Sequence, residues 1–109
     1  MIRPHTLSYS APTETASGSR VDVTSYGSAT AIRCYIEPET AEAAFQKFGI
    51  ADMRRPHLMF CTVASGQSMA VGGRGTYDGR LFRVAAPPML FQAGLSSDHA
   101  EVLLEESEF

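Results

Sequence analysis

The tightest constraint on the fold of this chain is an Asp-Gly pair between two short runs of strand-forming residues. Thr76 and Tyr77 precede Asp78-Gly79, and the alternating segment 80–85 follows. Glycine accepts the positive φ of a two-residue turn, so an Asp-Gly pair in this setting predicts a β-hairpin. The hairpin turn at Asp78 and Gly79 therefore indicates antiparallel β structure.

Further strands are predicted by short apolar or alternating runs. In the clearest of these, Ile32, Cys34 and Ile36 alternate with Arg33 and Tyr35, as in a strand with one buried face. The expected strands lie near residues 6–9, 21–23, 32–36, 57–63, 76–77, 80–85 and 99–106, with 69–71 as a weaker candidate. The pattern of 99–106 fits a strand or a short helix, and its context favours a strand. We expect a mainly β fold: a small antiparallel β-barrel of about six or seven short strands, or a sandwich.

Segments rich in small and turn-forming residues separate these strands. Loops or turns are expected at 10–20, 65–67, 72–75 and 89–98, and Pro87-Pro88 is expected to end the strand before it.

One long insertion, residues 37–56, interrupts the β pattern. Pro38 suits a first helical position, an alanine-rich run with Phe45 and Phe48 follows, and Gly49 can end a helix. Residues 50–56 have no clear period and end in Pro56, so we expect an exposed connection there. The prediction is one short helix inside an insertion of about twenty residues, and its deletion from Ala41 to Asp52 is expected to leave the barrel folded.

Length and composition indicate one globular domain, residues 1–109. Hydrophobic residues make up 44% of the chain, which excludes a disordered segment and allows one modest core. The longest apolar run, Leu58–Cys61, has four residues, whereas a membrane span needs about 20. The N-terminus lacks the pattern of a secretory signal, so we expect a cytoplasmic product without a membrane segment.

The net charge of −3 arises at one end of the chain. Residues 1–100 sum to +1, whereas the acidic end, residues 101–109, sums to −4. The cations are scattered among acids, so tight binding of duplex nucleic acid by one copy is not expected. The one basic pair, Arg54-Arg55, reads either as a solvated loop or as a contact for an acidic surface or a nucleic-acid backbone, which a ring of copies would strengthen.

No catalytic or metal-binding pattern emerges. Cys34 and Cys61 lie in apolar runs and are expected to be buried thiols, with a disulfide open if their strands are neighbours. The glycines of 72–79 feed a hairpin rather than a phosphate loop. Nothing arranges His5, His57 or His99 beside a nucleophile, and the C-terminal glutamates are expected to be solvated. We expect no enzyme, no cofactor and no metal.

Two segments carry a family resemblance. Residues 76–84 (TYDGRLFRV) and 99–106 (HAEVLLEE) resemble the C-terminal half of the head-closure proteins of long-tailed bacteriophages. These proteins are also called head–tail connector or stopper proteins. The match covers about a third of the chain, and the order of the remaining predicted elements agrees with it.

The resemblance implies a structural virion protein at the phage neck, present in the host cytoplasm during assembly. Such a protein forms a sixfold or twelvefold ring with itself, binds the adaptor on the portal side and a tail terminator or tail protein, and closes the channel around packaged double-stranded DNA without sequence specificity. In the family a long loop between early strands is the gate, and here that segment is 37–56. The implied channel-loop or partner contacts are Glu39, Glu42, Phe45, Lys47, Phe48, Arg54 and Arg55.

Two other functions remain open. A tail-completion or tail-terminator protein shares the small β fold and ring formation. A cytosolic OB-like or SH3-like binding module would need exposed aromatic residues beside cations, for which Tyr77, Phe82 and Arg83 are the candidates, although Phe82 fits the core better.

Overall fold

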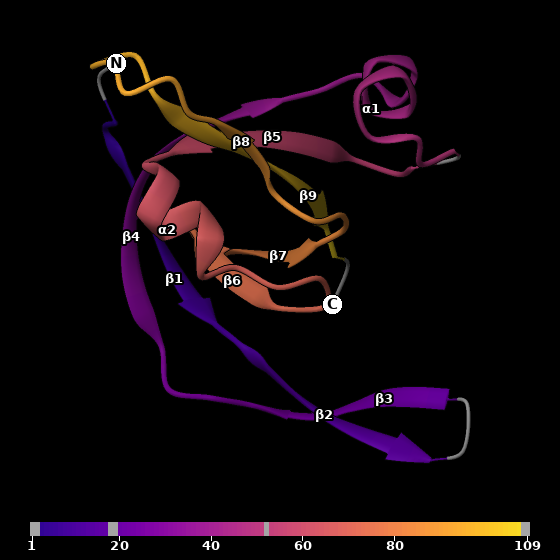
Figure 1. Cartoon of the computed structure of the whole chain (residues 1–109). Helices are drawn as coiled ribbons and strands as arrows, with labels where there is room; N and C mark the ends of the chain where they lie inside the picture. Colours follow the sequence, from indigo (N-terminus) through magenta and orange to yellow (C-terminus); the bar gives the residue numbers. More distant parts are fainter. Residues whose placement is uncertain (1–2, 18–19, 52, 108–109) are drawn as a thin grey trace.

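The computed structural model describes residues 3–17, 20–51 and 53–107, with the backbone alone for 14–17 and 20–24. Its elements are β1 (His5–Ser10), β2 (Pro12–Ser17), β3 (Arg20–Tyr26), β4 (Thr30–Pro38), α1 (Ala41–Phe48), β5 (Pro56–Cys61), α2 (Val63–Gln67), β6 (Arg74–Tyr77), β7 (Arg80–Val84), β8 (Met89–Phe91) and β9 (His99–Glu106) (Figure 1).

Six of the strands close into an antiparallel barrel, as the sequence predicts. Their order is β5-β4-β1-β6-β7-β9, and β9 pairs back with β5 to complete the circuit. Strand β8 pairs with the first residues of β9, on the same edge that β7 pairs with further along, and Leu90 lies opposite Ala100. The closing pair joins residues far apart in the chain, from Pro56 opposite Glu105 to Cys61 opposite Ala100.

The core fills the interior of this barrel. Alternate residues of each strand face it, and the expected alternation on β4 is confirmed because Ile32, Cys34 and Ile36 are buried. The other buried members of this core are Leu7, Tyr9, Met59, Cys61, Met69, Phe82, Val84, Ala100, Val102 and Leu104.

The predicted hairpin is confirmed. Strands β6 and β7 pair with Tyr77 opposite Arg80, and the turn residues Asp78 and Gly79 have φ values of 54° and 71°. Positive φ at both central positions is the turn geometry that follows the twist of the flanking strands.

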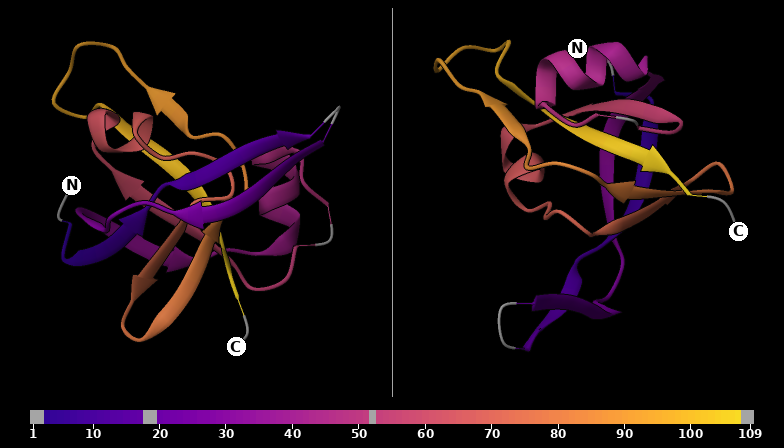
Figure 2. Two further views of the ribbon diagram at one scale, coloured as in Figure 1. Left: turned by 90° about the horizontal axis from the view of Figure 1, so that it is seen from below. Right: turned by 90° about the vertical axis from the view of Figure 1, so that its right-hand side faces the viewer.

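Residues 10–20, expected as a loop, instead belong largely to a two-stranded ribbon. Strands β2 and β3 pair with each other from Pro12 opposite Tyr26 to Ser17 opposite Arg20 and form a separate sheet. The ribbon continues the β1–β4 pair beyond the barrel and projects from it (Figures 1 and 2). The predicted strand at 21–23 is confirmed as part of β3. Strand β2 is joined to β3 by backbone hydrogen bonds and needs no apolar alternation, so the hydrophobic pattern did not mark it.

The segment between β5 and the hairpin also differs from the prediction. Residues 65–67 lie in helix α2, because Thr62 caps its start by accepting a hydrogen bond from the Ser65 amide. The weak strand candidate at 69–71 is not a strand. Arg74 and Gly75, expected to break the chain, are in β6.

Gly75 has a packing role within β6. A Cβ at this position would lie 2.7 Å from the side chain of Leu7. The missing side chain lets β6 pass close over Leu7, so this glycine belongs to a strand interior rather than to a turn.

The expected helix in the insertion is confirmed with a different start. Pro38 is the last residue of β4, and Thr40 caps α1 by accepting a hydrogen bond from the Ala43 amide at 3.1 Å. Gly49 ends the helix at φ 75°, as predicted. Residues 89–91, expected within a loop, form the short strand β8, and 99–106 is a strand, β9.

Candidate functional site

The insertion, residues 37–56, is partly built into the body of the protein. Helix α1 buries Ala44, and Phe48 packs beside it against Leu103 of β9. The connection after the helix, expected to be exposed, buries Met53 in the same cluster. This second, smaller core attaches the insertion to the outside of the barrel.

The outward side of α1 carries several of the predicted contact residues. Phe45 is 54% exposed and Glu42 is exposed on the same helix. Lys47 forms an ion pair of 3.1 Å with Glu39, which ties the last turn of the helix to the residue before its cap. Of the two phenylalanines, Phe45 is therefore available to a partner and Phe48 is not.

The Arg54-Arg55 pair lies beside the end of β9 rather than on a free loop. The Arg54 amide donates to the Glu105 carboxylate at 3.2 Å, and the Arg55 carbonyl accepts from the Glu106 amide at 3.2 Å. Arg55 has a positive φ of 48°. With Ser107, these residues line a hollow of about 320 Å³.

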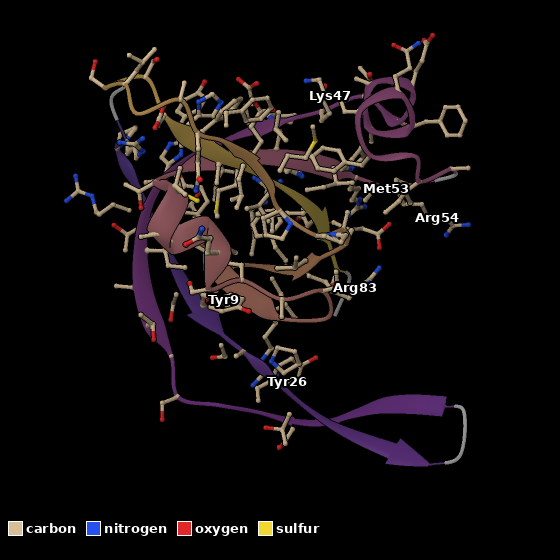
Figure 3. The ribbon with its side chains drawn as sticks, in the orientation of Figure 1. Tyr9, Tyr26, Lys47, Met53, Arg54 and Arg83 are labelled. Carbon is tan, nitrogen blue, oxygen red and sulfur yellow. The ribbon has the colours of Figure 1, made fainter. Side chains whose placement is uncertain are left out.

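The C-terminal glutamates, expected to be solvated, are paired with arginines of β7. Glu105 accepts from Arg83 at 2.9 Å, and Glu106 accepts from the Arg80 Nε at 3.1 Å. The bond from Arg80 lowers the pKa of Glu106, and the same bond raises the pKa of Arg80. Figure 3 places Arg54 and Arg83 on the same side of the barrel. The arrangement neutralises the acidic end locally, because β7 and β9 are neighbours in the sheet.

His57 is buried beneath this cluster. Its Nδ1 lies 3.0 Å from the Arg55 carbonyl, and its Nε2 lies 3.2 Å from a guanidinium nitrogen of Arg80. A carbonyl only accepts and a guanidinium only donates, so Nδ1 donates to the Arg55 carbonyl and Nε2 accepts from Arg80. His57 therefore has a structural place at the base of the insertion.

The base of the β2–β3 ribbon is fixed to the barrel. The Arg74 guanidinium lies 4.1 Å from the centre of the Tyr26 ring, and the Gly27 amide donates to the Ala11 carbonyl at 2.9 Å. Figure 3 shows Tyr26 where the ribbon leaves the barrel. The ribbon is thus an oriented arm. Its second strand contains the predicted strand 21–23, whereas no strand was predicted where β2 lies.

A shallow hollow lies at this junction. It has a volume of about 210 Å³ and is lined by Tyr9, Ala11, Ser28, Thr30, Ile32 and Ser68. The Tyr9 hydroxyl accepts a hydrogen bond from the Ala70 amide at 2.9 Å, so this polar group is already satisfied.

Aromatic rings form a row across the outside of the barrel. Neighbouring centroids are 4.7 to 6.2 Å apart, in the order Tyr77, His5, Tyr35, Phe60, His99 and Phe91. Two pairs are stacked at 13°, His5 with Tyr35 and His99 with Phe91, and the other neighbours are tilted by 40–42°.

The row ends at β8 and the following loop, which expose further apolar side chains. Leu90 and Phe91 are each 41% exposed, and Leu95 is 63% exposed. Asp98 orders the loop by accepting hydrogen bonds from the amides of residues 93, 94 and 95, and these bonds lower the pKa of its carboxyl group. This surface was not predicted from the sequence, because residues 89–98 were expected to form a loop.

The two cysteines and His99 are the remaining titratable residues of interest. Cys34 and Cys61 are buried free thiols, as the sequence predicts. Hydrogen bonds to the Ser97 carbonyl and the Glu101 carboxylate raise the pKa of His99. Among residues 3–17, 20–51 and 53–107, no group of three His, Cys, Asp or Glu side chains is placed to hold a metal ion. Glu108 lies outside the described residues.

Comparison of the chain with protein-family models and with curated proteins finds no match to either. In the described part of the chain, no helix is long and apolar enough to cross a membrane.

Proposed function

We propose that this chain is a structural protein of the neck of a long-tailed phage. In this proposal it forms a sixfold or twelvefold ring, closes the portal channel after DNA packaging and provides the platform for the tail. Its partners are copies of itself, an adaptor on the portal side, a tail terminator or tail protein, and the packaged DNA. Its role is mechanical, without catalysis or a cofactor.

The observation that carries the proposal is the β2–β3 ribbon. A two-stranded ribbon is marginally stable by itself in water, and this one projects from a closed barrel with its base fixed by Tyr26 and Arg74. In a ring, such an arm gains stability by lying over a neighbouring copy or by meeting the other arms at the centre.

The position of the resemblance supports the same function. The two segments that resemble head-closure proteins are the β6–β7 hairpin and β9, and β7 pairs with β9 from Phe82 opposite Glu106 to Val84 opposite Leu104. The resemblance therefore falls on one continuous part of the barrel wall.

Within this proposal, the ribbon takes the role of the channel loop. The insertion 37–56 suits that role less, because Phe48 and Met53 attach it to the barrel. Its exposed residues, Glu42 and Phe45, then become candidate contacts for the adaptor or the tail.

A ribbon-shortening variant tests the proposal. Thr13 and Ser25 are paired, so residues 14–24 can be replaced by Asn-Gly, which favours a two-residue hairpin turn. We expect the barrel to fold normally, and we expect phage particles carrying the variant to lose packaged DNA or fail to join tails. Unchanged DNA retention and tail joining would reject the proposal. Phe45→Ala, which leaves the ribbon intact, is the matched variant for a contact through α1.

The aromatic row favours a second candidate, an OB-like or SH3-like binding module. Tyr77 belongs to the row, whereas Phe82 is fully buried and Arg83 is paired with Glu105. Binding of single-stranded oligonucleotides by a monomer, with an affinity that falls steeply as salt rises, would favour this module over the neck protein. A tail-completion protein would instead bind the tail tube and not the adaptor.

A further inference from the structure

The two cysteines lie on the neighbouring strands β4 and β5, at the end of this strand pair that is remote from the insertion. Strands β4 and β5 pair with Ile36 opposite Met59 and Tyr35 opposite Phe60. The same register, continued by one residue, brings Cys34 opposite Cys61. Both side chains are fully buried in the barrel core. Directly opposite residues of an antiparallel pair have Cβ atoms about 4.5–5.5 Å apart, close to the separation of about 3.5–4.5 Å that a disulfide spans.

The electrostatics of the thiols agree with this placement. Burial raises the pKa of each thiol to about 11, and the pKa of Cys61 is raised further by the neighbouring Cys34. The raised pKa of each thiol reflects its burial, and the pKa of Cys61 also reflects the proximity of Cys34. Because the thiolate is the reactive form, both thiols are unreactive while the barrel end is closed.

Helix α2 covers the end of the barrel at which Cys61 lies. It follows Cys61 directly, with Thr62 as its cap. A Cβ at Gly66 would lie 3.7 Å from the Cys61 sulfur and 2.3 Å from the Ala100 Cβ. The absence of a side chain at Gly66 thus allows α2 to lie directly against Cys61 and Ala100, so displacement of α2 would expose Cys61.

We propose that Cys34 and Cys61 are a redox modification site, which forms a disulfide between β4 and β5 when α2 is displaced in the presence of a small-molecule disulfide such as oxidised glutathione. On opening, the Cys61 thiol loses its proton to water and the thiolate attacks one glutathione sulfur. One reduced glutathione leaves. Cys34, after losing its own proton, attacks the Cys61 sulfur of the mixed disulfide and releases the second. Two protein thiols are oxidised and one oxidised glutathione is reduced to two thiols.

The disulfide would link the two strands that flank the insertion. Strand β4 enters the segment that holds α1, and β5 leaves it. A covalent link between Cys34 and Cys61 closes a loop of the chain that contains the whole insertion, and so restricts the unfolded chain. This inference does not depend on the proposed function.

The test is oxidation of the folded protein in a glutathione series. Intact mass spectrometry is expected to show the loss of two hydrogens, and a digest without reductant is expected to yield a peptide that joins Cys34 to Cys61. The oxidised protein is expected to melt roughly 10 °C higher than the reduced one. Cys34→Ala is expected to give no internal link. Glutathione bound to both cysteines without a link, or no oxidation short of unfolding, would overturn the proposal.

A pair of glycine variants tests the opening step. Gly66→Ala would force α2 away from Ala100, and we expect the rate of disulfide formation to rise about tenfold. In Gly27→Ala, the added Cβ would meet only the Ala11 carbonyl oxygen at 3.8 Å, so we expect an unchanged rate. An unchanged rate in folded Gly66→Ala would reject the opening of α2. If that variant does not fold, a rate that rises with sub-denaturing urea in the natural chain supports the opening, and a constant rate rejects it.

Discussion

Two segments leave the barrel of this protein, and they differ in how they are held. The insertion 37–56 is predicted from the sequence to be a surface loop with a short helix, yet Phe48 and Met53 pack it against the cluster that contains Leu103. The ribbon 12–26 lies in a polar part of the sequence and is held by pairing of β2 with β3 and by contacts at its base. The difference teaches that apolar residues in an apparent loop indicate attachment, whereas their absence does not exclude regular structure.

The largest difference in unfolding free energy between the two segments is expected when each of them is removed. Deleting residues 41–52 is expected to lower the free energy of unfolding by at least about 3 kcal/mol, because Leu103 and Ala86 lose their cover. This reverses the expectation from sequence that the deletion leaves the barrel folded. Replacing 14–24 by Asn-Gly is expected to change the unfolding free energy by less than about 1 kcal/mol. Urea denaturation of both variants measures the difference, and equal losses would remove the distinction.

Two phenylalanines of α1 give a smaller and cleaner test. Phe48→Ala is expected to cost about 2 kcal/mol, because its ring packs in the second core. Phe45→Ala is expected to cost less than about 0.5 kcal/mol, because the ring is 54% exposed. Both changes alter helix propensity alike, so a difference between the two variants in chemical denaturation reports the packing of the insertion alone. Similar costs for both would contradict the packing of the insertion.

Alanine substitution of one glycine in each segment is expected to change stability by different amounts. Gly49→Ala is expected to cost about 1 kcal/mol, because Gly49 ends α1 at φ 75°. Gly27, at the base of the ribbon, has no positive φ, and the nearest atom to an added Cβ is 3.8 Å away. We expect Gly27→Ala to change stability by less than about 0.5 kcal/mol. Thermal melts of the two variants should rank them in this order, and the reverse order would contradict the cap at Gly49.

The smallest effect expected is a pH dependence beside the insertion. Arg80 lowers the pKa of Glu106 in the folded state. Stability from this bond is present above the unfolded pKa of a glutamate, about 4.3, and is lost as the pH falls through the lower folded value. Glu106→Gln should therefore flatten the fall of the melting temperature below about pH 4.3. As a control, the Gly27 amide, which donates to the Ala11 carbonyl at the ribbon base, should show the same rate of hydrogen exchange in the natural chain and in Glu106→Gln.

The barrel could be predicted from the sequence where a local signal marks it. Asp78-Gly79 identifies the hairpin, and the alternation of Ile32, Cys34 and Ile36 identifies the buried face of β4. The start of α2 also had a signal, because Thr62 can cap a helix through the Ser65 amide, and the glycine at position 66 obscured it.

The rest had no local signal. Pairing of β5 with β9 joins residues far apart in the chain, and no pattern specifies which strands close a barrel. The pairing of Glu105 and Glu106 with Arg83 and Arg80 depends on that arrangement, so a sequence reading could only assign them to solvent. The candidate contacts on α1 were predicted from the family resemblance, and helix propensity placed several of them on a helix, whereas Tyr26 and the β8 loop required the fold.

The closing strand has a consequence for synthesis of the protein. Strand β9 pairs with β5, β7 and β8, and it is translated after all three. A nascent chain on the ribosome cannot complete its barrel until residues 99–106 have left the exit tunnel. Until then β5 and β7 have exposed edges, and a message truncated before this point would yield a product prone to aggregation.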